Sequence, residues 1–485
     1  MNPRRLFVAS CIALITSAFS FMIRQDISDS LATDFVLTKQ AVGEIMGAAF
    51  LGMAVAMLVI SPLCDFLGMG RVLGLAWACH LVGILGTIFS PKPSVVSPDM
   101  SYWSLWLSTF LVGCGNGLVE VAINPLAATL FPKQKTHYLN VLHAWWPGGL
   151  IMSGLLATFC IPLLPLTNIQ PLQVWQVKVG LLLVPLVIYG LLALGQKFPQ
   201  TERVQANVSA GEMFLQILRP MFLLWAFCML LTASTELGPN QWQESVLKRT
   251  AHVSGTLVFV YTSGLMFIMR FFAGPLAHRL SPVGMLTVSA LFSAMGLYWL
   301  SYVDNPVMAF VAATIFGVGI AYFWPTMLGV TAERFPKGGA LLLGLMGSFG
   351  NLAIFVVLPQ MGAIYDSYTV ANLPPAIQKE QIRLPDGKEV PLVSPGENTW
   401  LPKAITDYIY PAGTKKLNPE AEKVLTGAPL KTEVGKAEAA GAAYAFRWVA
   451  VLPCILVVVF GLIAISDRLR GGYKAVHIAD LKSTS

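Results

Sequence analysis

The feature that most constrains this chain is a series of apolar runs, each about twenty residues long, separated by short polar connections. A helix of that length spans the hydrocarbon core of a bilayer. Composition agrees, since only 12% of the 485 residues are charged, whereas about a quarter are charged in a soluble domain. The sequence therefore predicts an all-α polytopic membrane protein.

Windows of about twenty apolar residues place twelve spans along the chain. They cover residues 6–33, 40–62, 71–90, 102–129, 138–161, 177–195, 220–243, 251–274, 283–301, 306–332, 340–365 and 442–465. The first follows two arginines, as a signal peptide would, but it has no small-residue cleavage site and we interpret it as a span. The seven cysteines, Cys160 among them, have no metal-ligand spacing, so we expect core residues without disulfides or bound metal.

Basic residues are concentrated at one set of span ends. Lys and Arg are frequent in the short loops on the side shared by both termini and rare in the opposite short loops. The positive-inside rule then predicts cytoplasmic termini in a plasma (inner) membrane. The same rule accounts for the net charge of +7 without nucleic-acid binding.

One connection differs from the others, because residues 367–440 are rich in Pro, Lys and Glu. Parity of the spans predicts that it lies outside the membrane, either as a solvated insertion or as a lid or docking element over the outer mouth. The predicted organisation is an N-terminal six-helix bundle (1–195), a cytoplasmic linker (196–219), a C-terminal bundle with this insertion (220–465) and a cytoplasmic tail (466–485).

The two halves share a repeated pattern. Residues 61–67 read SPLCDFL and residues 274–280 read GPLAHRL, with Pro, Leu and Leu in register, and Phe-Pro-Lys recurs at 131–133 and 335–337. Two six-span halves that enter from the same side form a parallel repeat about an axis along the membrane normal. This arrangement predicts a central cavity between the halves.

The first copy of the repeat resembles the signature of the major facilitator superfamily, a glycine with an aspartate four residues later and then basic residues. Ser61 replaces the glycine, whereas Asp65 and Arg71 match. In the second copy His278 replaces the acid and Arg279 is kept. The resemblance implies the major facilitator fold, twelve helices in two halves, with gating roles for Asp65, Arg71 and Arg279.

Span four carries a polar stripe, because Asn116, Glu120 and Asn124 recur every four residues. Such a stripe is either a hydrogen-bonded clamp between helices or part of a transport pathway. The run Gly-x-Gly-x-x-x-x-Glu-x-Ala-x-Asn-Pro at 113–125 resembles the span-four motif of the fucose permease (fucose–galactose–proton symporter) family. The resemblance implies that Glu120 is a proton-coupling residue next to the sugar. Asn116 and Asn124, on the same face, are candidate substrate-binding residues.

A second match to that family lies in span one, where Gln25-Asp26-Ile27 resembles its Asn-Asp-Ile segment. The resemblance implies that Asp26 is a second proton-coupling group. The alternative is an interfacial charge cluster with Arg24 and Asp29 near the outer surface.

Spans five and seven supply groups suited to a polyhydroxylated ligand. In span five Asn140 and His143 share a face beside Trp146, and in span seven Glu236 and Asn240 share a face before Trp242. Gly238-Pro239 is expected to break span seven. The alternatives are a packing histidine in span five and a hinge without ligand contact in span seven.

Three residues complete the predicted site. Trp324 and Asn351 are candidates for the second half of the cavity, although single aromatic residues in membrane helices often serve packing. Arg270 lies four residues before Gly274-Pro275, and we assign it to the inner gate.

These observations favour a secondary transporter of a small polar solute, a sugar, by proton symport with alternating access. The sequence has no nucleotide-binding loop, and we expect no cofactor, no enzymatic activity and a monomer in the lipid bilayer. Two alternatives stay open: an exporter or antiporter of another solute, and a membrane receptor or enzyme that does not transport. The duplicated halves favour transport, because alternating access explains them.

Overall fold

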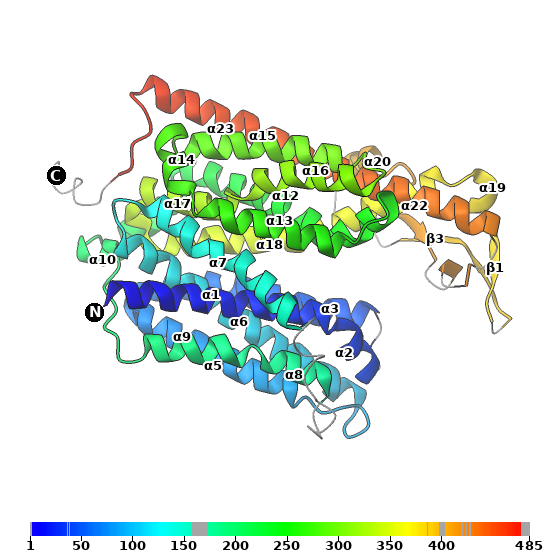
Figure 1. Cartoon of the computed structure of the whole chain (residues 1–485), viewed down its shortest axis with the longest axis horizontal. Coiled ribbons are helices and arrows are strands. Elements are labelled where there is room, and N and C mark those ends of the chain that lie inside the picture. Colours follow the sequence, from blue (N-terminus) through cyan, green and yellow to red (C-terminus); the bar gives the residue numbers. More distant parts are fainter. Residues whose placement is uncertain are drawn as a thin grey trace.

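The computed structural model describes residues 2–476 except 36, 38, 158–172, 386, 397–402, 419–420, 423 and 426–427, so Cys160 lies outside the described residues. The helices run side by side in two groups, the N-terminal residues below and the C-terminal residues above in Figure 1. The first helix begins and the last helix ends at one end of the molecule, here called the termini side, and the opposite end is the insertion side. The observed architecture is the predicted one, twelve helices in two halves.

The helices of the N-terminal half are α1 (Pro3–Asp26), α2 (Ser28–Asp34), α3 (Lys39–Ile60), α4 (Cys64–Leu67), α5 (Met69–Ile88), α6 (Pro98–Leu130), α7 (Lys135–Leu155), α8 (Val174–Gly180) and α9 (Leu183–Ala193). The connection between the halves contains α10 (Glu202–Gln205), α11 (Ala210–Leu215) and the 3-10 helix η4 (Gln216–Leu218). The C-terminal half contains α12 (Pro220–Thr250), α13 (Gly255–Arg270), α14 (Ala273–Leu280), α15 (Pro282–Leu300), α16 (Pro306–Ile320), α17 (Phe323–Arg334), η5 (Pro336–Gly338), α18 (Gly339–Asn372), α22 (Ala428–Val449) and α23 (Val451–Leu469).

Among the described residues, nine helical segments are long and apolar enough to cross a membrane, and the pair α13–α14, bent by 67°, is a tenth. Helices α3 and α7 coincide with the two remaining predicted spans. The first span is interrupted at Ile27, where α1 ends. The expected break at Pro239 is wrong, because α12 continues through this proline to Thr250.

Local sequence signals define several helix starts. Ser97 precedes Pro98, and its side chain accepts a hydrogen bond from the backbone N–H of Met100 at the start of α6. Asn305 precedes Pro306 and caps α16 in the same way. A capping oxygen followed by proline suits the first turn of a helix, where the N–H groups have no intrahelical acceptor.

Helices α3 and α6 approach each other closely through glycines. A Cβ atom on Gly52 of α3 would lie under 3.0 Å from the carbonyl oxygen of Phe110, and one on Gly113 of α6 would lie equally close to the carbonyl oxygen of Ala49. The two backbones are therefore in direct contact. This packing is typical of membrane helices, which associate through van der Waals contacts that small residues make possible.

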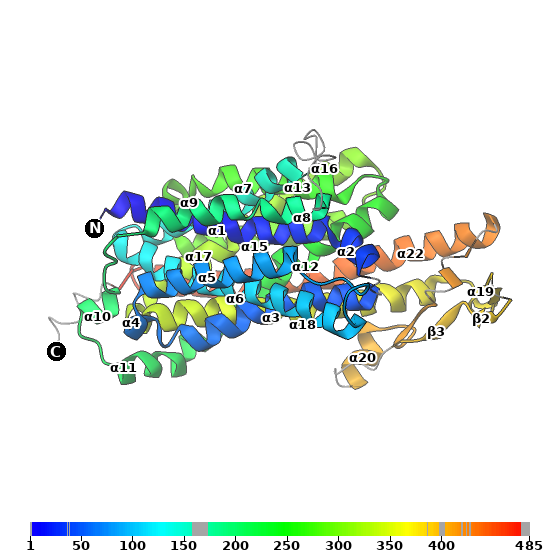
Figure 2. The same cartoon turned by 90° about the horizontal axis from the view of Figure 1, so that it is seen from below.

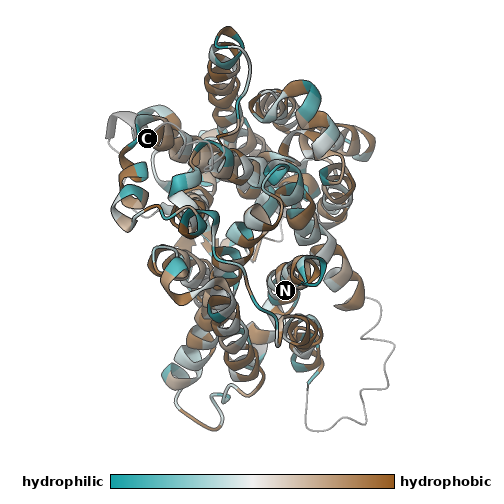
Figure 3. Cartoon of the chain, turned by 90° about the vertical axis from the view of Figure 1, so that its left-hand side faces the viewer, coloured by the Kyte–Doolittle hydropathy of each residue, from teal (hydrophilic) through white to brown (hydrophobic). Residues whose placement is uncertain are grey.

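The outer surface of the helices is apolar. Leu58, Val187 and Val458 have exposed fractions of 53%, 49% and 61%, and Figure 3 shows hydrophobic residues along the outer sides of the helices. An apolar surface of this extent is unfavourable in water but matches the hydrocarbon core of a bilayer. The chain is a multi-pass integral membrane protein.

The insertion forms a small folded unit beyond the helix ends (Figures 1 and 2). Helices α18 and α22 extend into the predicted segment 367–440, to Asn372 and from Ala428, and residues 373–427 lie between them. Its short helices are α19 (Pro375–Gln378) and α20 (Lys403–Ile409), and its antiparallel pairs are β1 (Gln381–Arg383) with β2 (Glu389–Pro391) and β3 (Val393–Pro395) with β4 (Lys415–Leu417).

The insertion has an apolar core of its own. Val390, Leu392 and Leu417 pack there against Leu373 and Val434. The Tyr410 hydroxyl donates a hydrogen bond to Gln360 of α18, and the backbone N–H of Ala412 donates to Ser367 at 3.1 Å. The described part of this segment is therefore a structured appendage of the C-terminal half.

Candidate substrate site

A cavity lies between the two halves, and its empty space, which includes solvent at its mouth, is about 610 Å³. Helices α1, α3, α6 and α7 contribute one wall and α12, α13, α17 and α18 the other. The lining residues are Phe21, Phe50, Met53, Glu120, His143, Trp146, Glu236, Leu237, Gln241, Arg270, Trp324, Asn351 and Ile354.

The N-terminal wall has a hydrogen-bonded group of three polar side chains. Asn124 Nδ2 donates to Glu120 Oε2 at 2.6 Å, and Asn124 Oδ1 lies 2.9 Å from His143 Nε2. Since an amide oxygen only accepts, Nε2 of His143 carries a hydrogen. The same Nε2 lies 3.7 Å from Glu120 Oε2. Glu120 is thus held by an amide and an imidazole, and all three side chains are buried.

The C-terminal wall is organised by Arg270, which is 2% exposed. Its Nη2 lies 3.5 Å from Glu236 Oε1. Glu236 is also buried, and its Oε2 has no hydrogen-bond partner among the residues that the structure describes. The cavity therefore contains one buried carboxylate from each half, and the C-terminal one is paired with a cation.

Two prolines explain why Arg270 is held here. Arg270 Nε donates to the carbonyl oxygen of Ala321, and Nη1 donates to that of His143, both at 2.6 Å. In a regular helix these carbonyls would accept from the residues four positions later, which are Pro325 and Pro147 and have no N–H. The guanidinium satisfies two carbonyls that proline leaves free, one in each half of the molecule.

The structure brings six of the predicted substrate and coupling residues into the cavity. They are Glu120, His143, Trp146, Glu236, Trp324 and Asn351. Asn124 lies directly behind Glu120 and His143. Arg270 was assigned to the inner gate, but it lines the cavity, because α13 ends at this residue and turns by 67° into α14.

Asn116 lies away from the cavity, in a polar cluster inside the N-terminal half. Its side-chain amide contacts His80 Nε2 at 2.9 Å and donates to Ser20 Oγ at 3.1 Å. Tyr189 contacts the other ring nitrogen of His80 at 3.3 Å. This arrangement is the hydrogen-bonded clamp between helices that was the alternative interpretation of the stripe.

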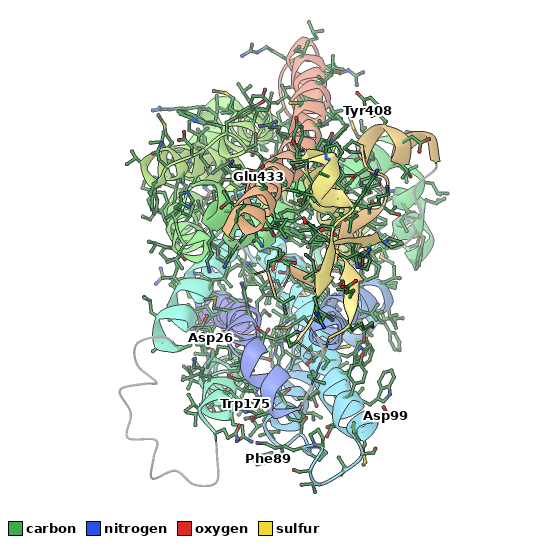
Figure 4. All side chains as sticks on the ribbon, turned by 90° about the vertical axis from the view of Figure 1, so that its right-hand side faces the viewer. Asp26, Phe89, Asp99, Trp175, Tyr408 and Glu433 are labelled. Atoms are coloured by element: carbon green, nitrogen blue, oxygen red, sulfur yellow. The ribbon has the colours of Figure 1, made fainter. Side chains whose placement is uncertain are left out.

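Asp26 is also outside the cavity. It lies at the insertion-side end of α1 (Figure 4), where its carboxylate accepts from Lys178 Nζ at 2.5 Å. The side chain is partly exposed to solvent. The partner is Lys178 of α8, and the side chain of Asp29 lies outside the described residues.

Three further predicted residues do not line the cavity. Asn140 donates to Thr326 Oγ1 at 3.2 Å on the termini side of the cavity. Trp242 packs against Tyr365, with ring centroids 5.9 Å apart, and Asn240 has a buried Oδ1 without a partner in the described part of the chain. The amide that the neighbouring segment contributes to the cavity is Gln241.

Sequence reasoning missed the apolar part of the lining. Phe21, Phe50 and Met53 face the same space as Trp146, and Phe21 and Trp146 are in edge-to-face contact with ring centroids 5.6 Å apart. Aromatic and methionine residues are common throughout membrane helices, so nothing in the sequence distinguishes these from lipid-facing ones.

The cavity is closed on the termini side by contacts between the halves. The backbone N–H and the hydroxyl of Thr136 in α7 donate to Glu333 Oε1 in α17, at 3.1 and 2.7 Å. Lys135 Nζ donates to the carbonyl oxygen of Ala332 at 3.3 Å. All these residues are buried. On the insertion side, the rim residue Gln241 is exposed.

The residues predicted to form the gate lie on the termini side but form separate contacts. Asp65 accepts from Thr201 and from Arg203 in the connection between the halves. Arg71 and Arg279 are exposed. In the same connection, hydrogen bonds from the Lys337 ammonium and the Ser209 backbone N–H hold the pKa of the Glu212 carboxyl below its usual range.

Comparison with known proteins supports the architecture. The gentisate transporter of Corynebacterium glutamicum is 21% identical over 379 residues, which cover 72% of this chain and 78% of that protein. Among solved structures, the proton:xylose symporter XylE of E. coli superimposes with a TM-score of 0.62 at 13% identity, covering 74% of this chain and 88% of that one. The transporter FucP in its outward conformation gives a TM-score of 0.58 at 15% identity, covering 93% and 99%.

These likenesses establish the fold, and the sequence itself establishes the family. The family model of the Major Facilitator Superfamily matches residues 6–358, which include the whole N-terminal half, the connection and most of the C-terminal helices. The chain therefore belongs to the Major Facilitator Superfamily of transporters.

Proposed function

We propose that this transporter carries a small polar organic solute, a sugar, together with protons by alternating access. The observation that carries this proposal is the pair of buried carboxylates, Glu120 and Glu236, on opposite walls of one cavity between the halves. Burial of an ionisable group in a membrane helix is unfavourable, so such a group usually has a partner or belongs to a transport pathway. Here Arg270 is the partner of Glu236, which leaves Glu120 as the proton carrier.

The neighbours of Glu120 suit this role. Asn124 donates to one of its oxygens, and no lysine or arginine forms an ion pair with it in the described part of the chain. Among the described residues, the one ionisable side chain within ion-pair distance of Glu120 is His143, whose Nε2 lies 3.7 Å from Oε2. A carboxylate without a fixed counterion responds to the proton concentration of whichever side the cavity faces.

The other lining groups support a sugar as the solute. Gln241 and Asn351 are amides that both donate and accept hydrogen bonds, and Trp146 and Trp324 offer flat apolar faces. Such a set matches the alternating hydroxyl groups and C–H faces of a sugar ring. The similar proteins XylE and FucP, which are proton symporters of xylose and fucose, support the same class.

We place the termini side in the cytoplasm, because the basic residues of the short loops lie on that side. The closed contacts around Thr136 and Glu333 then separate the cavity from the cytoplasm. In our proposal, this conformation receives solute and proton from outside.

The test is transport by Glu120→Gln in proteoliposomes. The amide resembles the protonated carboxyl, so the variant should exchange solute between equal pools but lose accumulation against a gradient. One charge that crosses 100 mV provides about 2.3 kcal/mol, which corresponds to a concentration ratio of about fifty. The wild type should approach this ratio and the variant should stay near one.

A matched control is Asp304→Asn, the same chemical change on an exposed residue of the α15–α16 connection. This variant should accumulate solute as the wild type does. Uphill, pH-dependent uptake by Glu120→Gln at the wild-type rate would remove Glu120 from the mechanism, and Glu236 would be the next carboxylate to test.

A second candidate solute is a small aromatic carboxylate. Arg270 offers a cation inside a cavity rich in aromatic side chains, and the similar protein from Corynebacterium glutamicum transports gentisate. A thermal-shift screen against sugars and aromatic acids separates the two classes. A ligand at one hundred times its Kd stabilises a protein by about 2.7 kcal/mol. Stabilisation by aromatic acids alone would exclude the sugar.

A further inference from the structure

A second and larger cavity lies on the termini side, outside the site between the halves. Its empty volume is about 1900 Å³, which includes solvent in its open mouth. The start of α7 forms one side, and the α14–α15 turn, the ends of α17 and α23 and residues 472–475 form the others. It therefore touches both halves of the transporter.

Basic side chains dominate this cavity. Lys133, Arg279 and Arg468 line it and are exposed, and none of them forms an ion pair within the part of the chain that the structure describes. His137 and His278 line it as well. The cavity thus offers three cations without a carboxylate partner among the described residues.

The two acidic residues of the lining are already engaged. Glu333 accepts from Thr136 through Oε1 and from the Tyr473 hydroxyl, at 2.6 Å, through Oε2. Asp467 is paired with Arg334. Arg334 neutralises Asp467, whereas the two hydroxyl donors leave the charge of Glu333 in place. Three cations beside one such carboxylate leave the lining with a net positive charge.

Two long helices also begin at this cavity. Helix α7, with 21 residues, starts at Lys135 without a side-chain cap, and helix α15, with 19 residues, starts at Pro282 beside Ser281. Residues of both first turns, Thr136 and Gly284, line the cavity. Both first turns are already engaged, because the Thr136 N–H donates to Glu333 and the Gly284 N–H donates to Ser281. The attraction for an anion therefore comes from the cations of the lining.

From the net positive charge of a cavity that touches both halves, we propose that the cavity binds a phosphate-bearing anion. Basic pockets between membrane helices on the cytoplasmic side are suited to anionic headgroups. The phosphate belongs either to a phospholipid or to a soluble molecule, and both present the same chemistry to Lys133, Arg279 and Arg468.

Because of the position of the cavity, a ligand bound there should affect transport. The contact between Thr136 and Glu333, which closes the termini side, forms part of its wall. A ligand that bridges Lys133 of the N-terminal half to Arg279 and Arg468 of the C-terminal half binds best when the halves are close on this side. By linkage, it shifts the transporter toward the closed termini side. This consequence depends on the proposed transport cycle, whereas binding itself does not.

The test measures binding to the purified full-length chain with two probes. Inorganic pyrophosphate tests a soluble phosphate by thermal shift, and dioleoyl phosphatidylglycerol tests a lipid by native mass spectrometry against the neutral dioleoyl phosphatidylcholine. Either probe alone supports the site and identifies the source of the phosphate. Failure of both on the wild type would overturn the proposal.

The variant Arg279→Gln/Arg468→Gln tests the location. Each cation near an anionic headgroup contributes about a fivefold change in affinity, so the double variant should bind about thirtyfold more weakly. The control Lys197→Gln/Arg219→Gln removes two exposed basic residues of the same side that do not line the cavity, and it should bind as the wild type does. Equal losses in both double variants would mean that only the general surface charge matters, and would refute a specific site.

Discussion

Removal of Arg270 tests the organisation of the cavity most directly. Its Nη2 lies 3.5 Å from Glu236 Oε1, and at an effective dielectric constant of about 20 two unit charges at this distance attract each other by about 5 kcal/mol. Arg270→Met leaves the Glu236 charge buried and also leaves two carbonyls without a donor. We expect a loss of stability of about 3–5 kcal/mol.

The double variant separates the charge pair from the carbonyl contacts. In Glu236→Gln/Arg270→Met no unpaired charge remains, so it should be more stable than Arg270→Met alone. Thermal unfolding in detergent, followed by tryptophan fluorescence, gives the melting temperatures for a double-mutant cycle. The control cycle is Glu433→Gln with Lys436→Met, an exposed pair at 2.7 Å, whose coupling should stay under about 1 kcal/mol. Additive effects at Glu236 and Arg270 would refute an ionised pair.

Three further predictions concern the scaffold and the coupling group. Gly52→Ala should lower the melting temperature, because overpacking typically destabilises by about 1–3 kcal/mol, whereas Gly47→Ala on the same helix has no atom within 4 Å of the new Cβ and should not. Replacement of residues 373–427 by a Gly-Ser linker should preserve expression and monodispersity, and lost uptake with normal folding would favour a lid. Asn124→Leu removes the donor to Glu120 and should alter the pH profile of uptake, and an unchanged profile would exclude Asn124 from coupling.

Much of the fold could be predicted from the sequence, because bilayer thickness sets the length of each apolar run. The repeat around Asp65 and His278 then indicated two equivalent halves. The helical ends of the insertion were not predicted. Its flanking helices α18 and α22 extend past the apolar windows as far as Asn372 and from Ala428, and hydropathy does not reveal helix outside a membrane.

The candidate site was predictable only in part. Ionisable residues in apolar helices are informative, and Glu120, His143 and Glu236 do face one cavity. The shared-face argument failed at Asn116, because a step of four residues rotates a side chain by about 40°. Two such steps separate Asn116 from Asn124, and Asn116 turns toward His80 instead. Arg270 was assigned to the wrong site. No sequence pattern shows which cation donates to the two carbonyl oxygens that the prolines leave without a donor.

The close contact of α3 and α6 has a mechanical consequence. Backbones that touch at Gly52 and Gly113 leave no room for the two helices to slide past each other. Phe50 and Glu120, which α3 and α6 contribute to the cavity, must then travel as one block when the halves rock. In the proposed cycle this part of the wall keeps its shape, and a solute senses the change of state as the approach and withdrawal of the opposite wall, with Glu236 and Arg270.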